Sequence, residues 1–453
     1  MVRVFHPFSS FAYTAKETVR HGRYTLQKKT RPCRVGLFME KLIVRPCGPL
    51  RGRVGIGGSK NAALPILAAT LLCEGPSLIG NLPSIRDVEL ALAILSGMGA
   101  TVERVDRSTY QVDSTHAACP AVPDPLSGCM RASAYLLGAC LARFGEGRVG
   151  CIGGCDFGGR PIDQHIKAFM AMGATVTVDE KEIYVRAEHL HGAEITFDTV
   201  SVGATVNAIL AAVRAEGETV LYHAACEPHV VDLAAYLNRC GADVRGAGTP
   251  TVRIRGVKRL QGCSYAVIPD MIEAGTYLLA GAATQGAVTV EGVEPAHLLP
   301  LTEKLGSMGA EIDCEERRIS LFATARLRGS AITTAPFPGF PTDLQPQMAA
   351  LFSVSVGESR VKETVWRHRF RYLAELQKMG AVVRAGEDYA VIRGTHLHGA
   401  AVQVPDLRAG AALLIAACTA EGESVLHAPW YIERGYEDFL GKLRSLGADI
   451  SAV

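Results

Sequence analysis

The sequence predicts an α/β protein built from six copies of one unit, and two glycine markers carry this prediction. A Gly-Ala pair follows an apolar stretch and precedes a short alternating run; these pairs begin at Gly99, Gly173, Gly241, Gly309, Gly380 and Gly447. A second glycine ends a small-residue stretch and precedes a β-rich run, at Gly75, Gly147, Gly217, Gly286, Gly357 and Gly422. Two independent markers that both return roughly every 70 residues indicate a repeated structural unit.

Each unit is expected to run strand, helix, strand, helix, strand. The glycine of each Gly-Ala pair suits the left-handed residue just past a helix, and residues such as 101–103 alternate like a half-buried strand. The helices expected over 204–215 and 409–420 carry Ala, Leu and Ile on nearly all faces, and a helix that is apolar all round is buried. Helices are therefore expected inside and sheets outside, in two domains of three units with a ligand cleft between them.

Bulk composition describes an ordinary soluble protein. The 453 residues exceed a single core, and 48% apolar with 20% charged residues is typical of globular domains. A net charge of +2 argues against a nucleic-acid footprint. The apolar runs 62–73 and 409–420 are too short to span a membrane. Thirteen cysteines without paired spacing indicate reduced thiols in a cytosolic protein, and no zinc pattern or organic cofactor motif is visible.

Residues 1–38 differ from the rest of the chain. Their basic residues face a single acid, Glu17, and there is no apolar core like that of a secretory signal. This pattern is typical of an organelle transit peptide. The interpretation that we favour is a start codon chosen too far upstream, with Met39 as the true start. In both cases the extension is left out of the fold.

Cys155 lies in the most reactive-looking segment, residues 152–161, where glycine pairs flank the thiol. Glycines let the backbone approach a ligand closely, and the nearby Arg160 favours thiolate over thiol. A cysteine near glycines is more often structural when nothing else is known. Arg131 and Arg143 precede the segment on an expected helix, and a thiol among arginines suits a small dianionic substrate.

Lys60 follows a glycine-rich turn, residues 55–58, that opens an apolar helix. The turn fails the phosphate-loop pattern, because Ser59 stands where that motif has glycine. A helix start still offers free N–H groups and a positive dipole end to an anion. A solvated lysine at a helix start is an equally good explanation.

Asp343 follows residues 337–341, a stretch rich in proline and glycine. The apolar neighbours are expected to desolvate the carboxylate and to raise its pKa toward that of a general base. The alternative is a helix N-cap aspartate, and both roles can coexist. Arg369 and Arg408 are further cations near expected glycine or helix starts.

Six segments together resemble the enolpyruvyl transferases that act on UDP-N-acetylglucosamine, from about Met39 to the C-terminus. They are 58–65, 131–133, 153–161, 201–205, 340–345 and 406–409. The family's fold is two inside-out α/β barrels built from six repeats. The resemblance implies a first barrel domain over 60–268 and a second over 39–59 plus 269–453.

The resemblance also implies a reaction: the enolpyruvyl group of phosphoenolpyruvate moves to the 3′-hydroxyl of UDP-N-acetylglucosamine, and phosphate is released. This would be the first committed step of peptidoglycan precursor synthesis, in the cytoplasm, with consequences for cell-wall formation, cell shape and cell division. The enzyme is expected to be a monomer that needs no metal or cofactor and binds only its small-molecule substrates.

Residue roles are carried over by position. The expected catalytic set is Cys155, the general acid and target of the epoxide fosfomycin, Asp343, the acceptor of the hydroxyl proton, and the cations Lys60 and Arg408. The expected substrate-binding residues are Asn61, Arg131, Arg160, Pro161, Ile162, Asp163, Gln164, Ser201, Val202, Gly203, Asp270 and Arg369.

The chain departs from the family pattern at three positions. Arg367 replaces an acid with a base, whereas Met271 in place of an arginine and Thr199 in place of a lysine reduce the positive charge around the nucleotide. Two rival interpretations stay open. One is 5-enolpyruvylshikimate-3-phosphate synthase, which shares the repeat fold but has no equivalent of the Cys155 loop. The other is a UDP-sugar-binding paralogue without turnover, which Arg367 keeps in consideration.

Overall fold

The computed structural model describes residues 40–453 except 124–125, 127–129, 151–161, 180–181 and 368. The predicted extension therefore lies outside the described residues, and the described residues belong to one compact unit. No helix among the described residues is long and apolar enough to cross a bilayer.

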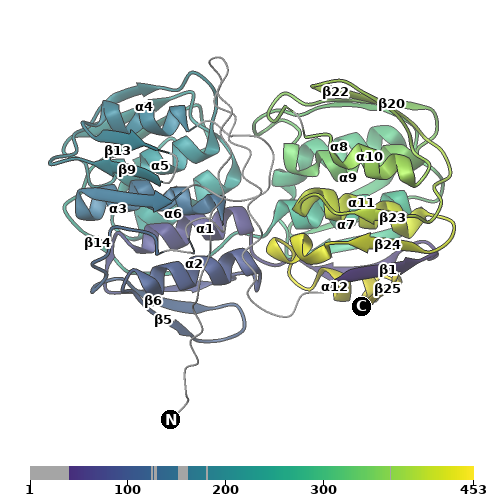
Figure 1. The fold of residues 1–453 in the computed structure, drawn as a ribbon, viewed down its shortest axis with the longest axis horizontal. Helices are drawn as coiled ribbons and strands as arrows, with labels where there is room; N and C mark the ends of the chain where they lie inside the picture. Colours follow the sequence, from purple (N-terminus) through teal and green to yellow (C-terminus); the bar gives the residue numbers. More distant parts are fainter. Residues whose placement is uncertain (1–39, 124–125, 127–129, 151–161, 180–181, 368) are drawn as a thin grey trace, which may run out of the picture. The chain divides into compact units, whose positions relative to one another are not determined.

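Within the described residues, six sheets of three or four strands correspond to the six predicted units, and their strand orders repeat (Figure 1). In the first half the sheets are β15-β4-β6-β5 (Ser264–Ala266, Pro76–Gly80, Tyr110–Asp113, Thr101–Arg104), β7-β9-β8 (Glu146–Gly150, Glu182–Arg186, Thr175–Val178) and β10-β11-β13-β12 (Glu194–Thr196, Glu218–Tyr222, Thr251–Arg255, Asp243–Arg245). In the second half they are β17-β18-β16-β2 (Glu311–Glu315, Arg318–Phe322, Ala287–Glu291, Arg51–Gly55), β19-β20-β22-β21 (Ala331–Thr333, Glu358–Lys362, Tyr389–Arg393, Val382–Ala385) and β23-β24-β1-β25 (Ala401–Gln403, Ser424–His427, Lys41–Arg45, Asp449–Ala452). A short pair joins β14 (Leu260–Gln261) to β3 (Cys73–Glu74).

Two helices accompany each sheet, and they differ in burial. The buried set is α1 (Lys60–Thr70), α3 (Tyr135–Phe144), α5 (Val202–Ala212), α7 (Met271–Ala283), α9 (Gln345–Val354) and α11 (Leu407–Thr419). The other set, which has one exposed face, is α2 (Arg86–Gly97), α4 (Asp163–Ala171), α6 (Pro228–Arg239), α8 (Leu299–Met308), α10 (Tyr372–Lys378) and α12 (Phe439–Ser445). Short 3-10 helices are η2 (Arg131–Ala134), η3 (Pro295–Leu298), η4 (Thr342–Leu344) and η5 (Pro429–Arg434).

The buried helices form the centres of two hydrophobic cores. One core combines α1, α3 and α5 with the strands of the first three sheets. The other combines α7, α9 and α11 with the remaining sheets, including β1 and β2 from the start of the described chain. In the second half of the chain, α7, α9 and α11 lie between the sheet carrying β20 and β22 and the sheet carrying β1 and β24 (Figure 1). The expected layout of helices inside sheets is confirmed.

The Gly-Ala markers do what their sequence predicts. All six glycines of these pairs have positive φ, between +92° at Gly173 and +107° at Gly309, and each follows a helix. An L residue with a side chain rarely adopts this conformation, so glycine ends each helix at low cost.

Two chain segments cross between the cores side by side, 55–59 and 267–270. Gly58 and Pro269 form an antiparallel bridge, the amide of Ser59 donates to the carbonyl of Ile268 (2.7 Å), and that of Asp270 to the carbonyl of Gly57 (2.9 Å). Glycine is required at position 58, because a Cβ there would lie 1.6 Å from the carbonyl oxygen of Asn81. We call these paired segments the crossover.

Candidate active site

Lys60, the first residue of α1, forms an ion pair with Asp87 in the first turn of α2. Its Nζ lies 2.7 Å from Oδ2 of Asp87, and both side chains are largely buried. Arg434, at the end of η5, contacts the same carboxylate through Nε, 3.0 Å from Oδ1, and Nη2, 3.3 Å from Oδ2. One buried carboxylate therefore holds two cations from distant parts of the sequence. We call Lys60, Asp87 and Arg434 the lysine cluster.

The charges of the lysine cluster compensate one another. Burial by itself would raise the pKa of Asp87, but the opposing charges of Lys60 and Arg434 outweigh it, so the pKa lies below its usual value. A carboxylate in such a site stays ionised at neutral pH. Removal of one partner from a buried pair typically costs about 3–5 kcal/mol, because the other charge is left uncompensated.

Asp343 forms the centre of a second cluster. Its Oδ1 accepts from Nη2 of Arg369 (2.9 Å), and its Oδ2 accepts from Nε (3.3 Å) and Nη2 (3.1 Å) of Arg408. The two arginine side chains are only 4% and 5% exposed, whereas that of Asp343 is 28% exposed. We call Asp343, Arg369 and Arg408 the arginine cluster.

This geometry corrects the expectation for Asp343. Its surroundings are two buried guanidinium groups and not only apolar side chains, and such partners favour the carboxylate anion. The N-cap interpretation was also wrong, since Asp343 lies inside η4 and the residue at the N-cap of α9 is Leu344.

Neighbouring groups fix the arginine cluster. Nη1 of Arg369 donates to Oγ1 of Thr342 (2.8 Å), whose hydroxyl donates to Oε2 of the buried Glu363 (2.9 Å). Arg408 lies 5.2 Å from the centre of the Tyr436 ring. Burial disfavours the charge on Arg408, but Tyr436 and Asp343 outweigh that effect and raise its pKa. Arg408 is therefore a permanent cation.

A short segment of the chain joins the two clusters. Arg434 belongs to the lysine cluster, and Tyr436, two residues later, stacks on Arg408 of the arginine cluster. Between them, a Cβ at Gly435 would lie 2.5 Å from Leu407 and 3.3 Å from Cδ of Lys60. Together the clusters bring four cations and two carboxylates close to one another, and the buried acids Asp270 and Asp406 act on the two arginines as well.

The glycine-rich turn before Lys60 does not present free N–H groups as expected. Oδ2 of Asp270 accepts from the amide of Lys60 (3.1 Å), and Oε2 of Glu273 accepts from the amide of Gly57 (3.0 Å). Oδ1 of Asp270 also caps α7 through the amides of Ile272 and Glu273. Carboxylates of the protein thus occupy the amides of Gly57 and Lys60, and the cation that this segment presents is the Lys60 side chain.

Two predicted nucleotide-binding segments meet at the starts of α4 and α5. Nε2 of Gln164 donates to Oδ2 of Asp198 (3.0 Å) and to Oδ2 of Asp163 (2.9 Å), and Oε1 of Gln164 accepts from the backbone amide of Asp198 (2.9 Å). Ser201 caps α5 by accepting from the amide of Ala204 (3.3 Å). Gly203 lies so close to His165 that a Cβ would come within 2.9 Å of the ring. Ile162 precedes α4, and Val202 is the first residue of α5.

The remaining predicted residues have mixed outcomes. Arg143, expected near the substrate, instead donates to four backbone carbonyls, those of Leu71, Ser114, Thr115 and Ala117, so its role is structural. The backbone of Arg131 begins η2, and Asn61 is half-buried in the first turn of α1. Cys155, Arg160 and Pro161 lie outside the described residues.

Sequence reasoning missed Asp87, Arg434 and His229. Asp87 and Arg434 stand 347 residues apart, and neither belongs to a motif. Burial lowers the pKa of His229, and the charges of Glu227 and Asp343 oppose that effect, which places the imidazole within electrostatic range of the arginine cluster. Arg367, the departure that raised doubt, is exposed. Among the described residues no group of three metal-ligating side chains occurs.

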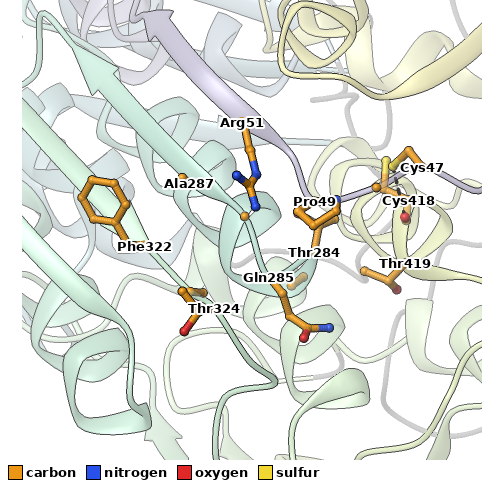
Figure 2. A pocket seen from close by; sticks show the side chains of 14 residues that line it. Cys47, Pro49, Arg51, Thr284, Gln285, Ala287, Phe322, Thr324, Cys418 and Thr419 are labelled. Carbon is orange, nitrogen blue, oxygen red and sulfur yellow. Dashed lines mark hydrogen bonds between the residues drawn. The ribbon is translucent and has the colours of Figure 1, made fainter.

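A pocket of about 500 Å³ lies elsewhere, where α7 and α11 end (Figure 2). Cys47, Arg51, Thr284, Phe322 and Cys418 are among its lining residues, and the thiol of Cys47 donates to the carbonyl of Cys418 (3.2 Å). No residue of either cluster lines it.

Comparisons with known proteins identify the family by sequence. The family model described as EPSP synthase (3-phosphoshikimate 1-carboxyvinyltransferase) matches residues 44–443. UDP-N-acetylglucosamine 1-carboxyvinyltransferase 3 of Caldanaerobacter subterraneus subsp. tengcongensis is 48% identical over 92% of this chain and 100% of its own length. UDP-N-acetylglucosamine 1-carboxyvinyltransferase 2 of Clostridium acetobutylicum is 47% identical over 91% of this chain and 99% of its own length.

Solved structures agree. The enolpyruvyl transferase NikO from Streptomyces tendae has a TM-score of 0.82 at 27% identity, covering 91% of this chain and 98% of that one. EPSP synthase from Acinetobacter baumannii, with a TM-score of 0.70 at 18% identity over 91% of this chain and 100% of that one, shares the fold. The predicted α/β fold of repeated units is confirmed. The chain belongs to the EPSP synthase family of carboxyvinyltransferases and, within it, to the UDP-N-acetylglucosamine 1-carboxyvinyltransferases.

Proposed function

We propose that this chain transfers the enolpyruvyl group of phosphoenolpyruvate to the 3′-hydroxyl of UDP-N-acetylglucosamine and releases phosphate. The observation that supports this proposal best is the gathering of four cations, Lys60, Arg369, Arg408 and Arg434, in the joined lysine and arginine clusters. Phosphoenolpyruvate carries a phosphate and a carboxylate, both of which guanidinium groups bind in bidentate fashion. Fixed cations also stabilise the charge that develops on departing phosphate.

The proposed roles follow an addition and an elimination. In the addition, the 3′-oxygen of the sugar attacks C2 of phosphoenolpyruvate, Asp343 takes the hydroxyl proton, and Cys155 protonates the methylene carbon. In the elimination, a proton leaves that methyl carbon and the C–O bond to phosphate breaks. Asp343 suits its role because its side chain is 28% exposed and the charges of Arg369 and Arg408 favour the carboxylate anion.

The other assignments are part of the same proposal. Lys60, Arg131, Arg160 and Arg408 surround the phosphate and carboxylate of phosphoenolpyruvate, with Arg369 beside them. Asn61 and Asp270 lie near the sugar, and residues 160–164 and 201–203 near the nucleotide. The two cores correspond to domains 60–268 and 39–59 plus 269–453. The enzyme acts as a cytoplasmic monomer in peptidoglycan precursor synthesis and is a target of fosfomycin.

Phosphate release tests the proposal. The wild-type chain should release phosphate from phosphoenolpyruvate only when UDP-N-acetylglucosamine is present. Cys155→Ala should abolish both turnover and labelling by an epoxide, while binding of the nucleotide sugar persists. Binding of both substrates by the wild-type chain without phosphate release would favour the paralogue that has lost turnover, and release that depends on shikimate 3-phosphate would favour the other rival.

A further inference from the structure

Glu273 is a buried acid next to the lysine cluster that has no role in the proposed reaction. It lies in the first turn of α7, its side chain is 4% exposed, and its Oε2 accepts from the amide of Gly57 in the crossover (3.0 Å). Its Oε1 forms a short ion pair with Nζ of Lys442 on α12. A buried carboxylate with both oxygens engaged holds its partners rigidly.

The contacts of Glu273 lead directly to Lys60. Asp270, three residues before Glu273, accepts from the amide of Lys60 (3.1 Å) and donates its own amide to the carbonyl of Gly57 (2.9 Å). Residues 57 and 60, at the two ends of the segment that presents the Lys60 side chain, are thus both bound to the first turn of α7. The ammonium of Lys442 compensates the negative charge of the buried Glu273 carboxylate and so offsets the cost of its burial.

We infer that Glu273 and Lys442 are positioning residues, which hold the backbone of residues 57–60 so that the Lys60 ammonium faces the anionic substrate. This inference rests on the proposed function, because it assumes that Lys60 binds phosphoenolpyruvate. Neither residue touches the substrate, so each acts through Lys60. A displacement of about 1 Å in a substrate-positioning group can cost a factor of about 100 in rate.

The ion pair titrates near neutral pH. Burial raises the pKa of Glu273 to about 7, against the opposing effects of Lys442 and of the Gly57 amide. The groups that face Glu273 among the described residues include Lys442 on α12, Asp270 at the N-cap of α7 and the phenol of Tyr277 on α7. Glu437 adds a further carboxylate, because a Cβ at Gly57 would lie 3.3 Å from its Oε2 and 3.6 Å from Oε2 of Glu273. Protonation below about pH 7 removes the negative charge that Lys442 compensates.

The chain offers a matched control on α10. Glu375 accepts from the amide of Gln403 (2.8 Å) and pairs with Lys378 (2.7 Å), as Glu273 does with Gly57 and Lys442, although this pair lies within one helix and Lys378 is 52% exposed against 21% for Lys442. Lys378 and Lys442 both belong to helices of seven residues. Lys378→Met therefore removes a similar ion pair without touching Lys60.

The experiment compares KM and kcat for wild type, Lys442→Met and Lys378→Met in the phosphate-release assay, with the melting temperature of each. Lys442→Met should raise the KM for phosphoenolpyruvate about tenfold and change the KM for UDP-N-acetylglucosamine less than twofold, because positioning errors act on the anion that Lys60 binds. Lys378→Met should leave both KM values unchanged.

A KM for phosphoenolpyruvate within twofold of wild type in Lys442→Met overturns the inference, whereas an inactive wild-type chain overturns the proposed function instead.

Two further variants guard against a merely structural effect. In Glu273→Gln/Lys442→Met no buried charge lacks a partner, so its KM should lie between those of wild type and Lys442→Met. For wild type the KM for phosphoenolpyruvate should rise as pH falls from 8 to 6, and for Glu273→Gln this rise should be smaller. The phosphate of the substrate titrates in both proteins, so the difference between the profiles is the readout. A double variant no better than Lys442→Met, or identical pH profiles, contradicts the inference.

Discussion

At the candidate site, the carboxylate of each cluster is compensated by two cations. Asp87 and Asp343 each face two cations. Asp87 lies on α2, which packs in the first core, and Asp343 lies in η4, which packs in the second. The sequence indicated Lys60, Asp343 and Arg408 from their glycine-rich or helix-start contexts. It did not indicate Asp87 or Arg434, because a buried ion pair between residues 347 positions apart leaves no local pattern. The environment of Asp343 was predicted wrongly for the same reason, since both of its arginine partners come from later segments.

Asp87→Asn tests the lysine cluster at this scale. It should lower the free energy of unfolding at pH 7 by about 3–5 kcal/mol, because Lys60 and Arg434 lose their buried counter-charge. The pKa of Asp87 is lowered in the folded chain, so its contribution is present above the unfolded pKa of about 4 and is lost as pH falls further. The difference between variant and wild type in urea unfolding should therefore persist down to about pH 4 and shrink below it. Glu89→Gln, an exposed acid in the same turn of α2, is the control and should change stability by less than about 0.5 kcal/mol. A pH-independent difference, or none, would refute the role of Asp87.

Helix starts position most of the functional side chains. Lys60 begins α1, Ser201 caps α5, Asp270 caps α7 and Asp406 caps α11 just before Arg408. The sequence indicated the helix starts near Lys60 and Arg408, whereas the one N-cap that it suggested, Asp343, was wrong. The crossover was not readable: its glycines suggested an anion-binding turn, whereas carboxylates of α7 occupy its amides. The sequence around these glycines gives no sign of Asp270 and Glu273, which lie about 210 residues later in the chain.

Gly58→Ala tests the crossover. A Cβ at position 58 would lie 1.6 Å from the carbonyl oxygen of Asn81, so the backbone must shift, and the variant should lose at least about 3 kcal/mol of stability or fail to accumulate. Gly55→Ala is the matched control, since a Cβ there meets nothing within 4 Å. Urea unfolding of both variants measures the difference. Equal stability of the two would show that the crossover tolerates displacement.

The whole molecule repeats one unit, and the residues that we propose for catalysis come from different copies. Lys60 and Asp87 belong to elements of the first core, whereas Asp343, Arg369, Arg408 and Arg434 belong to those of the second. The repeat was predictable because each copy ends its helices with the same left-handed glycine. How the copies contribute to one site was predictable only through the family resemblance, because it depends on packing between distant segments.

The central claim is that Asp343, held by two arginines, takes the proton of the attacking hydroxyl. Single-turnover phosphate release by Asp343→Asn tests it most directly, with the melting temperature measured beside it. Loss of the base should lower the rate about 10²–10⁴-fold and change the KM values less than about threefold. An unchanged rate, or a loss confined to KM in a folded variant, would contradict the account and assign Asp343 to binding alone.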